Sequence, residues 1–252
     1  MNQDKAEAAV ERLVRRIEEV NGKFLEMMGA RIKDVGEMSV TDAHRLIGMR
    51  EYGADVDELT RELARITDKN TDEIHELYEA MAKQDYDFAE RFYQARGKTH
   101  IPFEENETLR RFVDTVAETT AATYRNMSRS TAFQIPDGKG GMKLSSLAEV
   151  YNEVMDKAVT AVTMGHNDYF SEMRDVMTAL ADSGIRTVYT EGRGGLAADY
   201  ASGYSRRLDT AVRQNLLWGV KQCAVGTQER IAADIGADGY EVDYHRNPRP
   251  SL

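Results

Sequence analysis

Apolar residues recur every three or four positions through most of this sequence, which is the spacing of one face of an α-helix. In the first such stretch, ERLVRRIEE supplies charged side chains to the other face. Its apolar positions are Val10, Leu13, Val14, Ile17, Phe24 and Met28. The pattern predicts a long amphipathic helix near the N-terminus.

A second helix is predicted for TDKNTDEIHELYEAMAKQDYDFAERFYQARG. Asn70 stands three residues before Glu73, which is the spacing of a capping pair at a helix start, and Gly97 marks the end. The apolar positions that support this helix are Ile74, Leu77, Tyr78, Met81, Phe88 and Phe92.

Two breaks interrupt the helical pattern. GKTHIPFEEN is predicted as a short extended linker, because the residue before Pro102 avoids the helical region. A further helix follows, with Leu109, Phe112, Val113 and Val116 on one side. The second break, FQIPDGKGGMK, is the predicted boundary between an N-terminal helical region, residues 1–135, and a C-terminal helical region, residues 136–252. Its glycines lack the spacing of a phosphate-binding loop, so we predict a turn or flexible loop there.

The C-terminal region begins with two predicted helices. Ser146 and Glu149 form a capping-box pattern for the first of them, which Gly165 closes. Gly184 ends the next helix, whose apolar positions include Phe170.

Short strand signals distinguish the rest of the C-terminal region. IRTVYTEGRGG is rich in β-branched residues and glycine and predicts a short strand near residues 185–190. A long helix is predicted from about Arg206 to Ile235, and the alternation of YEVDYH predicts a short strand near residues 240–245. The predicted fold class is therefore mainly α: multi-helix and elongated, with a small β element in the C-terminal part.

Composition narrows the classes of function. The 43 acidic and 33 basic residues give a formal net charge of −10, which argues against a protein that coats DNA or an anionic membrane. The single cysteine, Cys223, excludes an internal disulfide framework and a multi-cysteine zinc site. No apolar run approaches the length of a membrane span, and MNQDKAEAAV lacks the features of a signal peptide. We expect the protein in the cytoplasm or in a particle assembled there.

The residue patterns predict no catalytic, cofactor-binding or metal site. None of the five histidines forms an HExxH motif or a comparable metal-binding pair. Cys223 falls within an apolar helical stripe, so we predict a buried structural thiol rather than a nucleophile. Glu241 and Asp243 face the same side of the predicted strand and suit acid and base roles, but an exposed strand face explains them equally well. An ADP-ribosyltransferase-like effector is the alternative function, with Tyr189, Arg193 and Glu241 as candidates, although that fold needs a larger β core.

The stretch YASGYSRRLDTAVRQNLLWGV carries the candidate partner contacts. Asp209 lies three residues after Arg206 and four before Arg213, so these side chains are predicted to share a helix face as a salt ladder. Trp218, the only tryptophan, lies off the apolar stripe and is predicted as a second packing surface or as an anchor for a partner. A helix that contacts the protein core on one side and a partner on another is typical of an assembly protein.

A local basic strip is the candidate DNA-facing surface. Its residues are Arg193, Arg207, Arg246 and Arg249, with Arg206 and Arg213 beside them. DNA binding is a less favoured function than a role in assembly because the chain has a net negative charge. Affinity for DNA grows with the number of phosphates that basic side chains neutralise.

Several segments resemble one known family. SGYSRRLDTAVRQNLLWGVKQ followed by GADGYEVDYHRNPRPS is similar to the C-terminal signature of the phage minor capsid protein 2 family, which is related to the head morphogenesis proteins of tailed phages. GKTHIPFEENETLRRFV, the stretch from LAEVYNEVMDKAV to ADSGIRTV, and ITDKNTDEIHELYEA also resemble that family, in the same order along the chain.

The resemblance implies a minor structural protein of the virion head that lies at the portal or the inner face of the capsid. It implies a role in head assembly or in DNA packaging and ejection, with no enzymatic activity and no cofactor. The implied partners are the portal protein, the major capsid protein, further copies of the chain and, weakly, packaged DNA, but no membrane. In the family, the Pro-Arg-Pro-Ser segment leads into a further tail with histidine and glycine. This sequence ends at Leu252, so we expect the functions of that tail to be absent from it.

Overall fold

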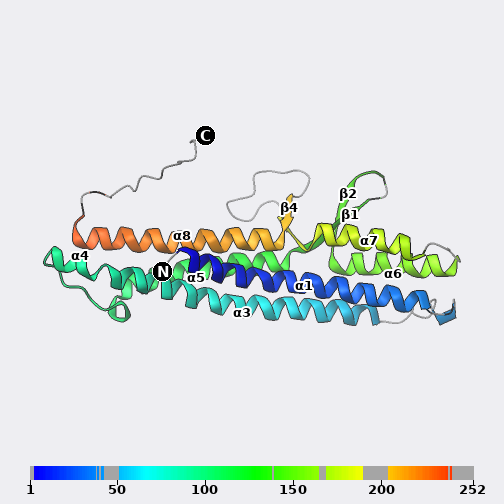
Figure 1. The fold of residues 1–252 in the computed structure, drawn as a ribbon, viewed down its shortest axis with the longest axis horizontal. Coiled ribbons are helices and arrows are strands. Elements are labelled where there is room, and N and C mark those ends of the chain that lie inside the picture. Colours follow the sequence, from blue (N-terminus) through cyan, green and yellow to red (C-terminus); the bar gives the residue numbers. More distant parts are fainter. Residues whose placement is uncertain are drawn as a thin grey trace.

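Long helices run side by side along the longest axis of the molecule (Figure 1). The computed structural model describes residues 3–37, 39, 41–42, 51–137, 139–164, 169–189, 204–237 and 239. Its longest helices are α1 (Gln3–Glu37), α3 (Glu51–Phe88), α5 (Glu107–Arg129) and α8 (Leu208–Ile235). The mainly helical, elongated fold predicted from the apolar spacing is confirmed.

These long helices share one hydrophobic core. Helix α8 packs against α1, α3 and α5, and α3 also packs against α1 and α5. The apolar face predicted for the first helix is buried at every predicted position: Val10, Leu13, Val14, Ile17, Phe24 and Met28. Burial of such side chains is the main favourable contribution to folding.

A second group of helices extends the bundle at one end. Helices α6 (Leu147–Thr163) and α7 (Tyr169–Ser183) pack against each other and against α1 (Figure 1). The predicted capping box of α6 is confirmed, because the Glu149 amide donates to Ser146 Oγ and the Ser146 amide donates to Glu149 Oε2. Gly184 ends α7 with a φ of 60°, in the left-handed region that glycine favours.

The opposite end of the bundle is formed by short elements. Helix α4 (Glu90–Ala95) follows α3 after an interruption at Ala89, and the 3-10 helix η1 (Phe103–Glu105) precedes α5. Asn106 caps α5 by accepting a hydrogen bond from the Leu109 amide at 3.1 Å. Gly97, predicted as a helix end, lies just beyond α4 with a φ of 63°.

A small antiparallel sheet lies beside the helices. Its strands are β1 (Thr131–Pro136), β2 (Met142–Ser145), β3 (Arg186–Tyr189) and β4 (Tyr204–Arg207), in the order β2-β1-β3-β4. The strand predicted near residues 185–190 is confirmed as β3. The strand predicted near residues 240–245 lies outside the described residues.

The glycine-rich break is a β-hairpin, and its prediction as a turn or flexible loop was therefore incomplete. Phe133 pairs with Ser145, and Pro136 pairs with Met142. In the turn, Asp137 Oδ1 accepts hydrogen bonds from the amides of Lys139 at 2.7 Å and Gly141 at 2.9 Å. A strand as short as Met142–Ser145 has too few residues to show an alternating pattern.

The predicted boundary between residues 135 and 136 falls inside β1. Helix α8, from the C-terminal region, also packs against α1, α3 and α5 from the N-terminal region.

Separate folding of residues 1–135 stays a prediction, and limited proteolysis tests it. The first cut is expected between Pro136 and Met142, with residues 1–135 remaining folded after separation from the rest. First cuts within α8, or loss of structure in the separated fragment, would contradict the division.

Asn70 does not begin a helix, contrary to the prediction from its spacing to Glu73. It lies within α3, fully buried. Its Nδ2 donates to the Leu13 carbonyl at 3.1 Å and to the Tyr124 hydroxyl at 3.0 Å, and its Oδ1 accepts from Arg16 Nη1 at 2.8 Å. Arg16 also forms an ion pair with Glu73 at 2.8 Å. Asn70 therefore joins α1, α3 and α5 through a buried polar network.

Phe88 and Phe92 do not continue the buried face of α3. Phe88 is 61 % exposed and Phe92 is 42 % exposed, whereas Tyr86, Ala89 and Tyr93 are buried. The buried positions follow the series from Tyr78 through Ala82 to Tyr86, which leaves Phe88 on the outer side of the chain.

Two glycines allow α8 to approach its neighbours closely. A Cβ at Gly219 would lie 2.1 Å from the Tyr78 hydroxyl and 2.6 Å from Thr120 Oγ1. A Cβ at Gly226 would lie 2.1 Å from Phe112 Cζ. Such separations lie far inside van der Waals contact, so the packing of α8 on α3 and α5 requires glycine at both positions.

Candidate partner-binding surface

The start of α8 is fixed by contacts that the sequence did not predict. The helix begins at Leu208, so Arg206 lies on strand β4 and does not share a helix face with Asp209 and Arg213. The Arg206 guanidinium donates to Gln214 Oε1 on α8. The predicted salt ladder through these three residues is therefore wrong, because it assumed that the helix already includes Arg206.

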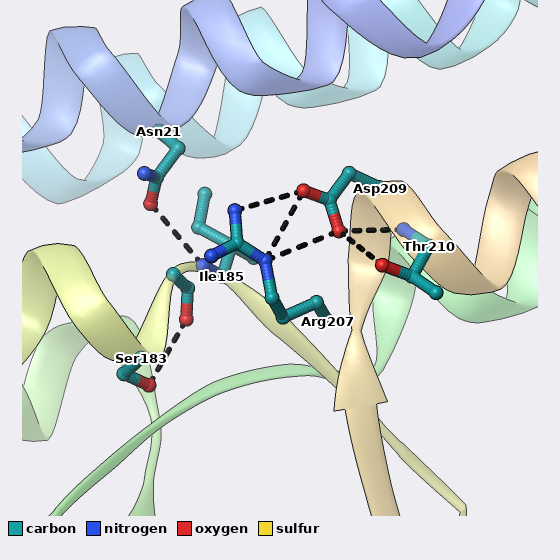
Figure 2. Close-up of polar contacts among 7 residues, drawn as sticks. Asn21, Ser183, Ile185, Arg207, Asp209 and Thr210 are labelled. Carbon is teal, nitrogen blue, oxygen red and sulfur yellow. Dashed lines mark hydrogen bonds and ion pairs between the residues drawn. The ribbon is translucent and has the colours of Figure 1, made fainter.

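Asp209 instead pairs with Arg207, as Figure 2 shows. Arg207 Nη2 lies 2.9 Å from Asp209 Oδ2, and the Thr210 hydroxyl donates to Asp209 Oδ1 at 3.1 Å. Burial opposes ionisation of Asp209, but the hydrogen bonds from Arg207 and Thr210 outweigh it and hold the pKa of this carboxyl below its ordinary value. A carboxylate in the first turn also matches the positive end of the helix dipole.

The Arg207 guanidinium also lies against the turn between α7 and β3. A Cβ at Gly184 would lie 3.2 Å from Arg207 Cζ. The next amide of that turn, from Ile185, donates to Asn21 Oδ1 of α1 at 3.1 Å (Figure 2). The start of α8, this turn and α1 therefore meet at one junction.

Arg213 connects α8 to α1. Its guanidinium pairs with the Glu11 carboxylate, and both side chains are about half exposed. An ion pair with this exposure contributes little to stability, roughly 0.2–1 kcal/mol.

Trp218 lies on the outer side of α8, as its place off the apolar stripe predicted. It is 52 % exposed, whereas Leu216, Gly219 and Cys223 on the same helix are buried. Val225, two helical turns further on, is 41 % exposed. Residues seven apart lie on one side of a helix, so Trp218 and Val225 are two exposed apolar side chains on the same side of α8, with the exposed Lys221 and Gln222 between them. This side of α8 is named the Trp218–Val225 surface below. The sequence pattern did not predict Val225 as part of this surface. Its position there is recognised only from the exposure of its side chain in the structure.

The described structure contains one member of the candidate DNA-facing strip. Arg207 lies there with its guanidinium bound to Asp209. Arg193, Arg246 and Arg249 lie outside the described residues, so the strip stays a prediction.

Cys223 is buried beneath α3, where its thiol donates to the Tyr78 carbonyl at 3.5 Å. Burial raises the pKa of the Cys223 thiol from its ordinary value of 9.0 to about 12. These features suit the predicted structural role, because the thiolate is the reactive form of cysteine.

We expect iodoacetamide to label Cys223 slowly in the native protein and rapidly in urea. A rise of about three pKa units lowers the thiolate fraction near pH 8 roughly a thousandfold. Since the pKa is raised on folding, the stability linked to this group is fully present below about pH 9 and is lost as pH rises toward 12. Mass spectrometry of timed samples measures the label. Labelling at equal rates in buffer and in urea would contradict the buried position.

The candidates for other chemistry fall mostly outside the described structure. Arg193, Glu241 and Asp243 lie outside it, as does the side chain of Tyr189. Within the described residues, no three His, Cys, Asp or Glu side chains gather in a way that suits a metal ion. No helix among those residues combines the length and the apolar character that crossing a membrane requires.

A family model described as "Phage minor capsid protein 2" matches residues 1–252. No curated protein and no solved structure gives a significant match.

Proposed function

This chain belongs to the phage minor capsid protein 2 family, and from that membership we propose that it binds the portal or the inner face of the capsid. In this role it acts in head assembly or in DNA packaging and ejection, in several copies on each particle. The match over residues 1–252 carries the proposal, because it supports a structural role in the phage virion. The partners proposed for it are the portal protein and the major capsid protein.

The Trp218–Val225 surface supports docking through α8. Trp218 leaves about half of a large aromatic ring in water, although the inner face of the same helix is packed against three others. Aromatic anchors of this kind concentrate binding energy in few residues. Arg206, Asp209 and Arg213 stay proposed partner contacts, but they do not surround Trp218. On a helix of 3.6 residues per turn, Asp209 lies about 180° and Arg213 about 140° around α8 from Trp218.

Trp218→Ala is expected to reduce incorporation into heads without unfolding the protein. Loss of an anchor costs about 2 kcal/mol of binding, or roughly a thirtyfold weaker interaction. Quantitative mass spectrometry of purified heads measures incorporation, and circular dichroism measures helix content. Asn152→Ala, at an exposed position of α6 away from this surface, is the control. Normal incorporation of the Trp218 variant would contradict docking through this surface.

The ion pair between Arg213 and Glu11 allows a companion control. Arg213→Glu places two carboxylates together, which breaks the ion pair with Glu11 and removes Arg213 as a proposed partner contact. Adding Glu11→Arg restores the ion pair, so the thermal stability should return while incorporation stays low. Recovery of incorporation along with stability would show that Arg213 acts only within the chain.

We also propose that the chain has no enzymatic activity. The alternative, an ADP-ribosyltransferase-like effector, requires NAD turnover. Incubation of purified protein with NAD and measurement of released nicotinamide tests this point, and turnover above that of a heat-denatured sample would contradict it.

A further inference from the structure

Two exposed phenylalanines and an arginine form a cluster where α3 meets α4. The rings of Phe88 and Phe92 are arranged edge to face, with 6.2 Å between centroids. The Arg91 guanidinium lies over both rings, with its Cζ 3.9 Å from the centroid of Phe88 and 4.6 Å from that of Phe92. We name these three residues the Phe88–Phe92 cluster. Its cation–π contacts hold the arginine in a defined position before any partner arrives.

The aromatic rings of the cluster are not fully covered by other parts of the described chain. Phe88 and Phe92 are 61 % and 42 % exposed, in contrast to the buried Ala89 and Tyr93 beside them. The ion pairs found among the described residues do not include Arg91. A guanidinium presents N–H donors in a planar fork that fits a carboxylate with two parallel hydrogen bonds. The cluster thus offers apolar rings and an oriented cation together, the combination enriched at binding hot spots.

We infer that the Phe88–Phe92 cluster binds another protein of the phage head through a segment that presents one carboxylate between apolar side chains. The carboxylate pairs with Arg91, and the apolar side chains cover Phe88 and Phe92. This inference rests on the proposed function, which places the chain in the head.

The charges around the cluster favour this partner over nucleic acid. Asp87 and Glu90 are exposed beside Arg91, and the chain carries a net charge of −10. A phosphate backbone would bring repeated negative charge against these carboxylates. A single carboxylate in an otherwise apolar segment brings only one negative charge near Asp87 and Glu90, and its pairing with Arg91 offsets the smaller repulsion.

The cluster is separate from the Trp218–Val225 surface. Tyr93, next to Phe92, donates to Asp234 near the C-terminal end of α8 at 2.9 Å. Trp218 lies sixteen residues before Asp234, which corresponds to about 24 Å along a helix. The chain therefore has two contact surfaces at different positions along its length.

Photo-crosslinking in assembled heads tests the inference. The photoreactive amino acid p-benzoylphenylalanine replaces Phe88 in one variant and Met142 in the control, since Met142 is 54 % exposed on β2. We expect a cross-link from position 88 to a peptide of another head protein that contains Asp or Glu, at several times the yield from position 142. A cross-link to DNA, a cross-link to a second copy of this chain, or a yield no higher than the control would overturn the inference.

Substitution of Arg91 gives a second measurement. Arg91→Ala should lower the position-88 cross-link about tenfold, and Arg91→Lys should lower it severalfold because lysine lacks the planar fork. Unchanged yields in both variants would overturn the role of the carboxylate. Absence of the wild-type protein from heads would overturn the proposed function and this inference together, whereas presence without the cross-link would overturn this inference alone.

Discussion

Replacing Gly219 by alanine is expected to lower the free energy of unfolding by about 3 kcal/mol, although alanine is the better helix former. The added Cβ would lie 2.1 Å from the Tyr78 hydroxyl. Tyr78 cannot move aside easily, because it is fully buried and donates to the Leu216 carbonyl at 3.0 Å. Either α8 shifts outward or Tyr78 loses this hydrogen bond, and both changes destabilise the core.

Gly226 provides a graded comparison. A Cβ there meets Phe112, which is only partly buried and lies beneath the Arg230 guanidinium. Phe112 has more freedom to move than Tyr78, so Gly226→Ala should cost less than Gly219→Ala. The double variant should lose about 4–5 kcal/mol, since sites this far apart are nearly additive.

Gly22→Ala is the matched control for these variants. Gly22 lies within α1, and a Cβ there would have no atom within 4 Å. This change should stabilise the protein by about 0.5–1 kcal/mol through helix propensity alone. Urea denaturation followed by circular dichroism measures the wild type and the four variants. If Gly219→Ala and Gly22→Ala changed stability equally, the close approach of α8 would have no energetic importance.

Asn70→Ala is expected to destabilise the protein by about 3 kcal/mol. It removes the hydrogen bonds that Asn70 donates to Leu13 and Tyr124 and the one that it accepts from Arg16, and it leaves a small cavity. Arg16 keeps its ion pair with Glu73 at 2.8 Å, which limits the loss of stability that comes from its broken hydrogen bond. The Tyr124 hydroxyl, by contrast, loses a partner in a fully buried position.

Two further variants separate the causes of this loss. Asn70→Leu keeps the volume without the hydrogen bonds, and we expect it to retain most of the destabilisation. Asn152→Ala, at an exposed position of α6, should stay within about 0.5 kcal/mol of the wild type. Thermal unfolding followed by circular dichroism gives the comparison. Wild-type stability of Asn70→Leu would mean that the polar network contributes nothing net.

Features set by neighbouring residues were predictable from the sequence. The capping box of Ser146 and Glu149 depends on residues three apart, and the left-handed turn at Gly184 depends on one residue type. The apolar face of α1 repeats over many turns, so its period is clear. The exposure of Trp218 followed from the same reasoning, because its position falls off the stripe that α8 buries.

Features set by distant residues were not predictable in this way. Asn70 and Glu73 fit a capping pattern, but partners more than fifty residues away place Asn70 inside α3. Gly219 and Gly226 are inconspicuous in sequence, and only the positions of Tyr78 and Phe112 show why glycine is required. The pairing of Asp209 with Arg207 depended on the residue at which α8 begins, and element boundaries are poorly determined by sequence patterns.

The packing of α8 against α1 also affects how the chain folds during synthesis. Helices α1, α3 and α5 leave the ribosome first, and α3 packs against both of the others. The apolar surface that α8 covers on these helices stays exposed until α8 has been made, and α8 ends more than one hundred residues after Arg129. At about 5–20 residues per second, that surface stays uncovered for roughly 5–20 s in each new chain. Nascent chains are therefore expected to need chaperone protection in this interval, and a slowly translated codon run after α5 would lengthen it.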